Sequence, residues 1–580
     1  MDTIGHDVRP GWPRTVTVAF ALAVLAIIAS IASSPANAYR FQFDDPDIVF
    51  YIDTTLTASA AMRTESPKQP GTQPTGKFTV FESAGDVYSS PVSALMDIGL
   101  SKGNYGVFTR LSYIYDYTIM KSDCSNCRRP TAALGLGFPN PDGIATDAQK
   151  EAGRNFSILD LFVYGGWYIG DRPLNVRVGK QVISWGESNI SGGGISQMQN
   201  PTDLGKRTTP GTEVKETLLP QESVYFNFGL TDNVELEGYY TWNWRNSVFL
   251  QVGTLFSPFD FIGTGYNPDL FVPGIEFSGR EEPSGGQWGV GLHFILERFN
   301  AAELGIYYTR SHAFSPFISR NPDYVPRPDP ARPGFNTLAG YQWEYGEDQD
   351  TYAISLSGET ILDASFGLEL NLKTDFYDTR QCQNSFGIGS FFGIPGAGGN
   401  GTKGVTPGCD IGNSDMYTFL GNFTRSTGTT LLNADKLSLV FDWSAVWITD
   451  LDKGDPTDRL QSKKFKPLNR VDVGNFYGVD ALDRPLTEFS WGYNFVAGLE
   501  YNDVFANVNV LPTLIFSHAV EGYTPFQAGA LVENTRTIVA KVGFTYLTRT
   551  QVDVQWVHWI GSASTSDDAD NLSIVFKYSF

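Results

Sequence analysis

The sequence has few of the residues from which disulfide scaffolds and metal sites are built. Its 580 residues include 4 Cys, 5 His and 6 Met. So few cysteines in so long a chain exclude a disulfide-rich scaffold. Basic residues are also scarce, because 42 Lys and Arg stand against 63 Asp and Glu, giving a formal net charge of −21. A nucleic-acid partner requires a basic footprint, so the composition argues against that class of protein.

Long hydrophobic runs are missing beyond the N-terminus. Arg9 and Arg14 precede an apolar run over residues 16–31, and an Ala-Asn-Ala cleavage site ends at Ala38. This pattern is typical of a secretory signal peptide, so we expect residues 1–38 to direct export and to be removed. The alternative is a membrane anchor, but the run is shorter than the ~20 residues that a helical span needs. The rest of the chain has no run long enough for a helical span.

Aromatic residues and glycine are abundant by contrast. Aromatics make up 14% of the chain, there are 60 glycines, and charged residues reach only 18%, below the roughly 25% of an average soluble protein. So many aromatic side chains argue against disorder, because they would not stay solvated. Apolar and polar residues also alternate with period two along the chain, which is the signature of β-strands. From Val234, for example, Leu236, Tyr240 and Trp242 share one face.

The predicted strands favour a membrane barrel over a soluble sheet, which shows the same alternation with its apolar face inward. They run about ten to thirteen residues, longer than the globular mode of 5–6 but suited to a tilted membrane strand. Their connections alternate between very short and very long. The last strand ends with Tyr578 and Phe580. Such an ending resembles the signal that outer-membrane barrels present to their assembly machinery.

The number of strands is predicted by counting the amphipathic segments and requiring an even total. Bacterial barrels have an even number of strands, short periplasmic turns and long outer loops. Including the weakly amphipathic segment 415–425 gives eighteen strands, and sixteen is the alternative. We therefore predict an all-β fold, a transmembrane antiparallel β-barrel that forms a single domain over residues 39–580. Its strands are expected over residues 50–62, 94–101, 105–118, 157–169, 174–184, 221–230, 233–245, 285–297, 301–312, 350–360, 365–377, 415–425, 435–448, 491–502, 505–518, 535–547, 550–560 and 571–580.

One long connection differs from the others. It carries dense charge of both signs, while the glycines at Gly192–Gly194 and the turn at Asn200-Pro201 permit sharp reversals. We predict that residues 185–220 fold into the lumen and form a constriction, because opposed charges tune solute passage in pores. The alternative is a solvated surface loop. The expected constriction residues are Trp185, Glu187, Asp203, Lys206, Arg207, Glu213, Lys215 and Glu216.

The polar faces of the strands are expected to line the lumen. A barrel of 16–18 strands is wide enough for an aqueous channel unless loops plug it. A wall rich in acids and poor in lysine disfavours anions. The predicted lumen-wall residues are Arg177, Gln181, Glu235, Glu237, Glu369 and Asp553.

The four cysteines fall outside the predicted strands. Cys124 and Cys127 form a C-x-x-C motif in one long loop, and Cys382 and Cys409 bracket another. An oxidising envelope favours the disulfides Cys124–Cys127 and Cys382–Cys409. A thioredoxin-like redox motif would need a βαβ context that is missing. A zinc site that draws on both pairs is the remaining alternative.

No cofactor or metal site is predicted elsewhere. An acidic cluster spans residues 450–458, and calcium prefers carboxylate ligands. The spacing of an EF-hand and its terminal Glu are absent, so a solvated loop is expected. Acidic outer loops would also bind divalent ions that bridge surface lipopolysaccharide.

The sequence offers little for catalysis. An outer-membrane hydrolase needs a nucleophile, a base and an orienting group. His293, His312, His518 and His558 each lie on or at the end of a predicted strand. Ser517 and His518 are adjacent, but neighbours on a strand point to opposite faces. Neither G-x-S-x-G nor H-E-x-x-H occurs, so we do not expect an enzyme.

Several motifs resemble a known family, the outer-membrane proteins catalogued as domain of unknown function 1302. The resemblance covers essentially all of the mature chain, and the motifs around Trp185 and Trp491 are distinctive in combination. It implies an exported outer-membrane protein with no settled activity. Relatives are often encoded beside a periplasmic or lipoprotein partner and large inner-membrane exporters of hydrophobic compounds, which implies traffic of lipid-like molecules. The motifs are Ile52–Leu56, Gly179–Ser188, Gly193–Ile195, Asn200-Pro201-x-Asp203, Pro210-Gly211-x-Glu213, Lys215-Glu216, Leu219-Pro220, Gly229–Asn233, Glu237-Gly238, Ser490–Tyr493, Leu511-Pro512 and the final strand.

Together these observations predict an outer-membrane channel or transporter. Its solute is expected to be hydrophobic or amphipathic and to pass a lumen narrowed by residues 185–220. The alternative is a closed barrel that serves as a receptor, an adhesin or a docking platform for a periplasmic partner. The expected partners are outer-membrane lipid, lipopolysaccharide and the barrel assembly machinery, with a periplasmic partner and an inner-membrane exporter implied by the resemblance.

Overall fold

The computed structural model describes most of the chain from Tyr39 to Phe580. The described residues are 39–66, 80–81, 83–122, 144–187, 190–257, 264–265, 275–320, 325, 328, 339–360, 363–378, 412–449, 487–524, 531–561 and 568–580. The predicted signal peptide, the four cysteines and the acidic cluster at 450–458 lie outside these residues. None of the described helices is long and apolar enough to cross a membrane.

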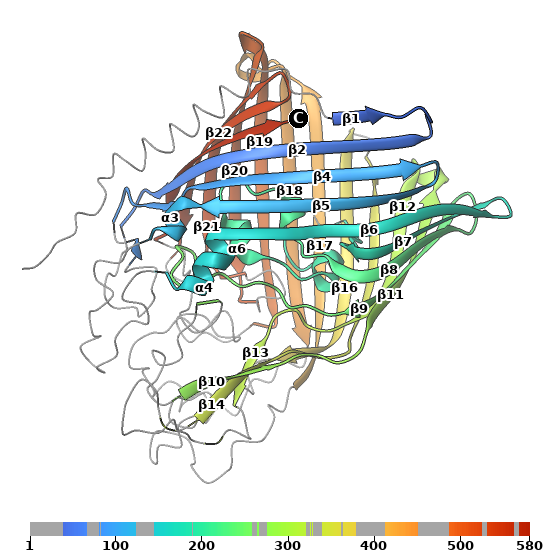
Figure 1. Cartoon of the computed structure of the whole chain (residues 1–580), viewed down its shortest axis with the longest axis horizontal. Coiled ribbons are helices and arrows are strands. Elements are labelled where there is room, and N and C mark those ends of the chain that lie inside the picture. The colour runs from blue at the N-terminus through green and yellow to red at the C-terminus, as the bar shows by residue number, and fades with distance from the viewer. Residues whose placement is uncertain are drawn as a thin grey trace, which may run out of the picture.

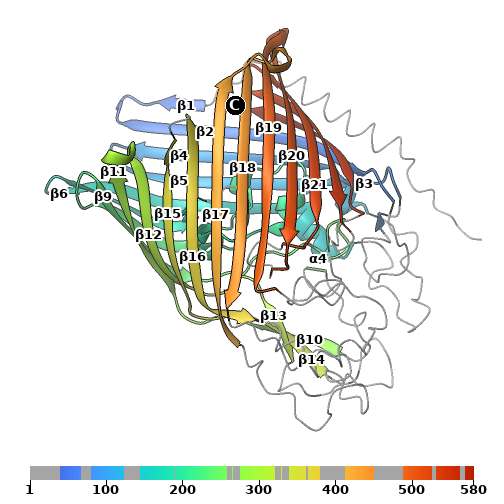
Figure 2. The same ribbon diagram turned by 180° about the vertical axis from the view of Figure 1, so that it is seen from behind.

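Eighteen antiparallel strands form a closed barrel within the described part of the chain. Each strand pairs with the next along the sequence, and the last strand, β23, pairs with β2 to close the sheet. In this closing pair Thr55 is opposite Ser579 and Arg63 is opposite Asn571. Figures 1 and 2 show the wall from two opposite sides, with β2, β4, β5 and β6 nearest the viewer in Figure 1.

Every predicted strand overlaps one strand of the barrel. The weakest prediction, 415–425, is confirmed as β17, which pairs with β16 and β18 along most of its length. The barrel therefore has eighteen strands and not sixteen. The strands are β2 (Ile48–Arg63), β4 (Pro91–Lys102), β5 (Tyr105–Asp116), β6 (Arg154–Ile169), β7 (Arg172–Gln181), β8 (Gln221–Gly229), β9 (Val234–Asn243), β11 (Gln287–Leu296), β12 (Ala302–Ser311), β15 (Gln349–Glu359), β16 (Ala364–Asp378), β17 (Gly412–Gly428), β18 (Lys436–Thr449), β19 (Phe489–Phe505), β20 (Val508–Glu521), β21 (Arg536–Tyr546), β22 (Thr550–Ile560) and β23 (Asn571–Ser579).

Short turns join the strands at one end of the barrel. The turn after β4 contains Gly103 with φ 56°, and the turn after β19 contains Asn507 with φ 61°. Gly and Asn adopt this left-handed conformation most readily, which explains why these residues serve tight reversals. The C-terminus lies at the same end, where the Thr54 N–H donates to the Phe580 carbonyl at 2.8 Å.

The alternation of each strand separates an apolar outer face from a polar inner face. Leu161, Val163, Ile306 and Leu514 are among the exposed large apolar side chains of the wall. Such a surface would be costly in water and suits a hydrocarbon environment. The period of two in the sequence thus sets which residues face the lumen.

Several further elements do not belong to the eighteen strands of the barrel wall and were not predicted, because their segments lack a periodic pattern. β10 pairs in parallel with β14, and β13 completes this small sheet (Figure 1). β1 continues beside the start of β2. These elements are β1 (Tyr39–Gln42), β3 (Val87–Ser89), β10 (Ile275–Glu281), β13 (Phe317–Arg320), β14 (Ala339–Glu344), α3 (Tyr117–Met120), α4 (Thr146–Ala148), α5 (Ile195–Gln199), α6 (Leu204–Thr208), and the short helical turns Gln149–Gly153, Val214–Glu216, Glu297–Phe299 and Leu431–Asn433.

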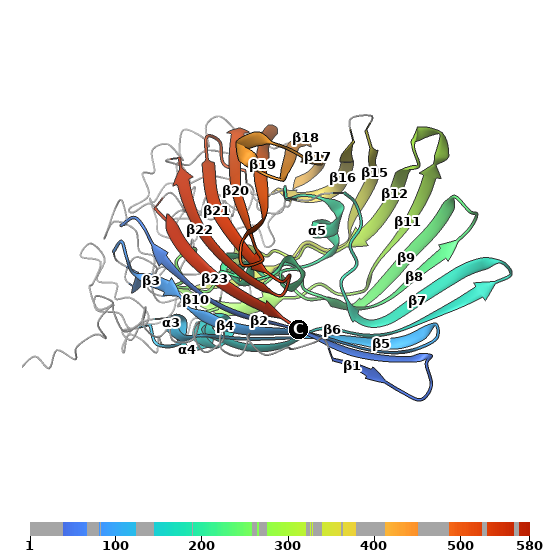
Figure 3. The same cartoon turned by 90° about the horizontal axis from the view of Figure 1, so that it is seen from above.

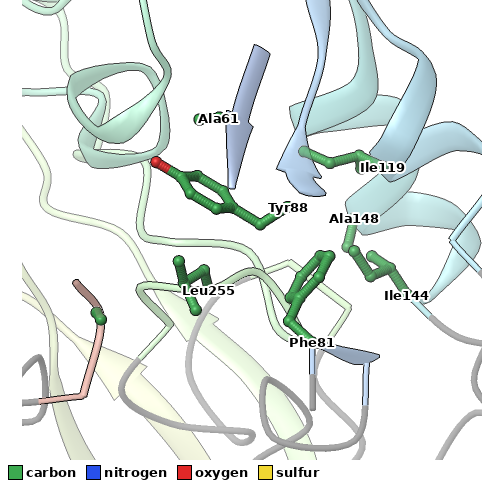
Figure 4. Close-up of a cluster of buried hydrophobic side chains, with 8 residues drawn as sticks. Ala61, Phe81, Tyr88, Ile119, Ile144, Ala148 and Leu255 are labelled. Carbon is green, nitrogen blue, oxygen red and sulfur yellow. The ribbon is translucent and has the colours of Figure 1, made fainter. Parts of the chain in front are cut away.

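The long connections share a hydrophobic core at the other end of the barrel. Phe81 and Tyr88 from the β2–β4 connection pack with Ile119 and Ile144 from the β5–β6 connection and with Leu255 from the β9–β11 connection (Figure 4). A core of this kind fixes the loops relative to one another, because each buried apolar side chain contributes roughly 1.5–3 kcal/mol.

A buried arginine joins two of these connections. Arg63, at the end of β2, is fully buried. Its guanidinium donates to the carbonyls of Glu65 and Phe81 at 3.0 Å each and to the carbonyl of Asp568 at 2.6 Å. Arg63 thereby holds the β2–β4 connection against the β22–β23 connection.

Candidate functional site

The connection between β7 and β8 lies inside the ring of strands. It covers residues 182–220, of which 188 and 189 are outside the described residues, and it carries α5 and α6. Figure 3, a view from above, shows α5 within the barrel. Its polar groups bond to inward-facing side chains of strands on several sides of the lumen. The inner face of the barrel therefore holds this connection, here named the lumen loop, in place.

Glu369 on β16 accepts three hydrogen bonds at the centre of one contact. The N–H of Glu187 donates to its Oε2 at 2.8 Å, and the N–H of Ile195 donates to its Oε1 at 2.7 Å. Asn371 donates to the same Oε1 at 2.7 Å. The backbone approaches closely at Gly186 (φ 81°), where an added Cβ would lie 2.2 Å from the Glu369 carboxylate. Only glycine fits there, which accounts for the SWGE sequence of the loop.

Asp442 on β18 forms a second contact of the same kind. Its carboxylate accepts from the N–H of Ile190 at 3.2 Å and from the N–H of Ser191 at 3.0 Å. The Ser191 hydroxyl also donates to it, and Asn494 on β19 donates at 3.0 Å. The two carboxylates thus bind the loop backbone by charge-assisted hydrogen bonds, which are roughly twice as strong as neutral ones.

Trp185 anchors the start of the lumen loop. Its ring stacks on Tyr307 at 5.4 Å and meets Tyr239 edge-on at 5.1 Å between ring centroids. Its Nε1–H donates to Glu237 Oε2 at 2.5 Å. Gly289 on β11 leaves room for the indole, because an added Cβ would lie 3.0 Å from it.

The far end of the loop contacts the opposite part of the wall. Lys215 lies 3.6 Å from Asp97 on β4 and 3.2 Å from Glu213, and Ser112 on β5 donates to Glu216 at 2.8 Å. The Ser59 hydroxyl on β2 donates to the carbonyl of Pro210 at 2.8 Å. The lumen loop therefore crosses from β9 and β16–β19 to β2–β5.

The remaining predicted constriction residues lie elsewhere. Asp203 caps α6 by accepting from the N–H of Lys206 at 2.9 Å. Asp203 also forms an isolated β-bridge with Val248, which lies in the β9–β11 connection. Burial raises the pKa of Asp203 and lowers the pKa of Arg207. The eight predicted residues thus form three groups and not one ring.

The predicted lumen-wall residues lie on the inner face of their strands, most of them in polar contacts. Arg177 lies over the Tyr225 ring at 4.2 Å. Gln181 is buried and donates to the carbonyl of Ser223 at 3.2 Å, and Glu235 accepts from Asn227. Asp553 accepts from Gln551 at 2.8 Å and lies 4.0 Å from Lys541. Glu237 and Glu369 bind the lumen loop, as described above.

Sequence reasoning missed Asp442 and Asn494, and it missed Arg110, which lies between Asp97 and Asp160 at 2.7 and 3.0 Å. A signal for Asp442 was present, since it is the only acid in β18. No sequence signal indicated its partner in the lumen loop.

The described residues show no arrangement typical of hydrolysis. His293 binds Glu303 at 2.6 Å, His558 binds Asp570, and His518 lies 3.4 Å from Arg536. No group of three or more His, Cys, Asp or Glu in the described ranges is placed to hold a metal ion. The absence of enzymatic activity stays a prediction.

The C-terminal residues Tyr578 and Phe580 lie together, with ring centroids 5.6 Å apart. Tyr578 is buried in a small cluster with Ala58 and Phe576. Tyr578 therefore lies in the strand that closes the barrel by pairing with β2. A role for the two residues in assembly remains a prediction.

Comparison with known proteins places the chain in a family. The chain is similar to the crystal structure of Acinetobacter baumannii OccAB3, with 9% identity and a TM-score of 0.39 over 92% of this chain and 99% of that one. It is similar to the outer membrane protein OpdK from Pseudomonas aeruginosa, with 10% identity and a TM-score of 0.39 over 92% and 98% of the two chains. Similarity at this level does not extend to function. No curated protein matches the sequence. Residues 19–580 match the family described as protein of unknown function (DUF1302), and the chain therefore belongs to this family.

Proposed function

We propose that the protein is an outer-membrane channel or transporter in which the lumen loop acts as a constriction or gate. The supporting observation is that two inward carboxylates, Glu369 and Asp442, bind the backbone of this loop inside an eighteen-stranded barrel. A barrel of this size encloses an aqueous lumen unless something occupies it. A loop held by a few hydrogen bonds at defined points is suited to reversible displacement.

The solute is proposed to be hydrophobic or amphipathic. The loop carries apolar side chains as well as charge inside the barrel, including Trp185 between two tyrosines and Met198 in α5, both buried against the wall. Aromatic and methionine side chains contact apolar molecules favourably and adapt to their shape. The expected partners, namely lipopolysaccharide, the assembly machinery, a periplasmic partner and an inner-membrane exporter, are proposals as well.

The test is single-channel conductance of the purified, refolded protein in a planar bilayer. Wild type is compared with a variant that lacks residues 189–209, and circular dichroism checks that both are folded. We expect low conductance from wild type and a larger, steady conductance from the deletion variant. Asp553→Asn serves as the control, because Asp553 faces the lumen but bonds to Gln551 and not to the loop. Equal conductance of wild type and deletion variant would contradict the gate.

A closed surface module is the second candidate. It is favoured by the outer core of Phe81, Tyr88, Ile119, Ile144 and Leu255, which joins three long connections into one packed unit. This candidate predicts that both the wild type and the deletion variant stay silent in the bilayer. It also predicts specific binding through the outer connections.

A further inference from the structure

A lysine on the inner face of β16 is buried, and the described residues supply no counter-ion for it. Lys373 has a side chain on the same face as Glu369 and Asn371, and it is only 5% exposed. No ion pair or hydrogen bond joins its ammonium to another of the described residues. Lysines are almost never so deeply buried unless they are paired, because desolvating an isolated charge is costly. An external anion is one way to meet this cost.

Two threonine hydroxyls without partners among the described residues lie in one cross-strand row with the lysine. Thr351 on β15 is directly opposite Lys373, and Thr309 on β12 is directly opposite Thr351. Side chains at such positions lie roughly 5 Å apart. The hydroxyls of both threonines are buried and have no hydrogen-bond partner in the described part of the chain. Native proteins leave few buried polar groups unpaired, so this concentration indicates that a bound group completes it.

An apolar cluster adjoins the same lysine. Met416 on β17 is directly opposite Lys373 and packs with Met198 of α5, Val446 and Ile448. The chain has only 6 methionines, and two of them meet here. Methionine side chains are flexible, so they rearrange around an inserted apolar group at low cost.

We propose that Lys373 and its surroundings bind the carboxylate of an amphipathic monocarboxylate, with the apolar chain of the ligand lying against Met198 and Met416. The inference rests on the proposed function, since it names the solute class of the same lumen. A single lysine and two hydroxyls match one negative charge and its hydrogen bonds, whereas a doubly charged anion would need further cations. The inner-face carboxylates of Glu369 and Asp442 are already bound by loop N–H groups, which reduces their repulsion of a second anion.

The test is thermal unfolding of the full mature protein in lipid nanodiscs, followed by circular dichroism. The probes are sodium octanoate, sodium acetate and 1-octanol at matched concentrations. A ligand that binds only the folded state raises the unfolding temperature in a concentration-dependent way. Wild type is compared with Lys373→Met, Thr351→Val and the control Lys541→Met, whose lysine already lies 4.0 Å from Asp553.

We expect octanoate to stabilise wild type and Lys541→Met equally, and to bind Lys373→Met about tenfold more weakly or worse, as loss of a charged hydrogen bond implies. Thr351→Val is expected to weaken binding severalfold, which covers the case in which Lys373→Met fails to fold. Acetate and 1-octanol should each bind far more weakly than octanoate. Equal stabilisation of wild type and Lys373→Met, or none in wild type, would overturn the proposal. If acetate stabilised the protein as much as octanoate does, the proposed contact of an apolar chain with Met198 and Met416 would be overturned. These unfolding measurements are independent of the conductance test. Failure of the proposed gate and failure of this proposed site can therefore be told apart.

Discussion

Ser191 in the lumen loop donates both its backbone N–H and its hydroxyl to Asp442 on β18, 251 residues later in the sequence. Asn494 on β19 donates to the same carboxylate oxygen and lies 3.2 Å from the Ser191 hydroxyl. The loop and the wall therefore share one small polar network. Its members are partly or fully buried, so each hydrogen bond is stronger than it would be in water.

Removing this carboxylate should free part of the loop. Asp442→Ala deletes the acceptor for Ile190, Ser191 and Asn494, and a hydrogen bond to a charged group contributes about 1.5–3 kcal/mol. A shift of about 2 kcal/mol corresponds to about a 30-fold increase in the population of the displaced loop. We expect a proportionate rise in mean single-channel current, while Asp553→Ala leaves the current near that of wild type. An Asp442→Ala variant with wild-type current would argue that the loop is not held at this point.

The indole of Trp185 should contribute to docking of the lumen loop as much as the carboxylates do. Trp185→Ala removes the stacking on Tyr307, the edge contact with Tyr239 and the donor to Glu237. Truncation of a packed Trp costs roughly 3–5 kcal/mol, and here this loss would destabilise the docked state of the loop. Limited proteolysis should then cleave within residues 190–209 at least tenfold faster than in wild type. Trp185→Phe keeps the stacking and is expected to be cleaved at an intermediate rate.

The docking of the loop should depend on pH through Glu187. Burial raises the pKa of the Glu187 carboxyl; a hydrogen bond with Ser357 opposes the rise, and the nearby carboxylates of Glu303 and Glu369 add to it, while His293 opposes it. A carboxyl with a raised pKa in the docked state is penalised when ionised, so docking is weakest above the raised pKa. The penalty disappears as the pH falls to the ordinary glutamate value, about 4.3.

Conductance is therefore expected to fall as the pH is lowered from 7 toward 4.5. The measurement is the open probability in the bilayer as a function of pH. Glu187→Gln is neutral at every pH and should show a low, flat profile, apart from any contribution of the other lumen carboxylates. A pH response of Glu187→Gln identical to that of wild type would assign the effect to other groups.

Arg63 should stabilise the outer connections. Arg63→Met removes the donors to the carbonyls of Glu65, Phe81 and Asp568, and a buried polar group left without a partner costs about 1–3 kcal/mol. We expect hydrogen exchange of the residues around Phe81 and Ala569 to accelerate at least tenfold, while exchange in the barrel strands is unchanged. Arg63→Lys should recover only part of the protection, because lysine lacks the planar fork that reaches three acceptors. Unchanged exchange in Arg63→Met would mean that the apolar core alone holds the connections.

The sequence was sufficient for the wall of the barrel. The side chains of a strand alternate with period two, so burial of one face in lipid leaves a local pattern that can be read without knowing the neighbours. Parity then supported residues 415–425, whose own pattern is weak, because an even number of strands is required for the termini to meet at one end. The register that places Thr55 opposite Ser579 follows from closure.

The lumen loop was predicted from its charge and glycine content, but its partners were not. Asp442 and Ser191 are too far apart in sequence for any local pattern to link them, and the charges that stand out in the sequence fall into three separate groups in the structure. The packing of Phe81 with Leu255, the reach of Arg63 to Asp568 and the isolation of Lys373 are likewise long-range. Local alternation determined the strands of this protein, because it depends on one residue and its neighbours along the chain. Only the tertiary structure decided what occupies the lumen, because that depends on which side chains the closed barrel brings together.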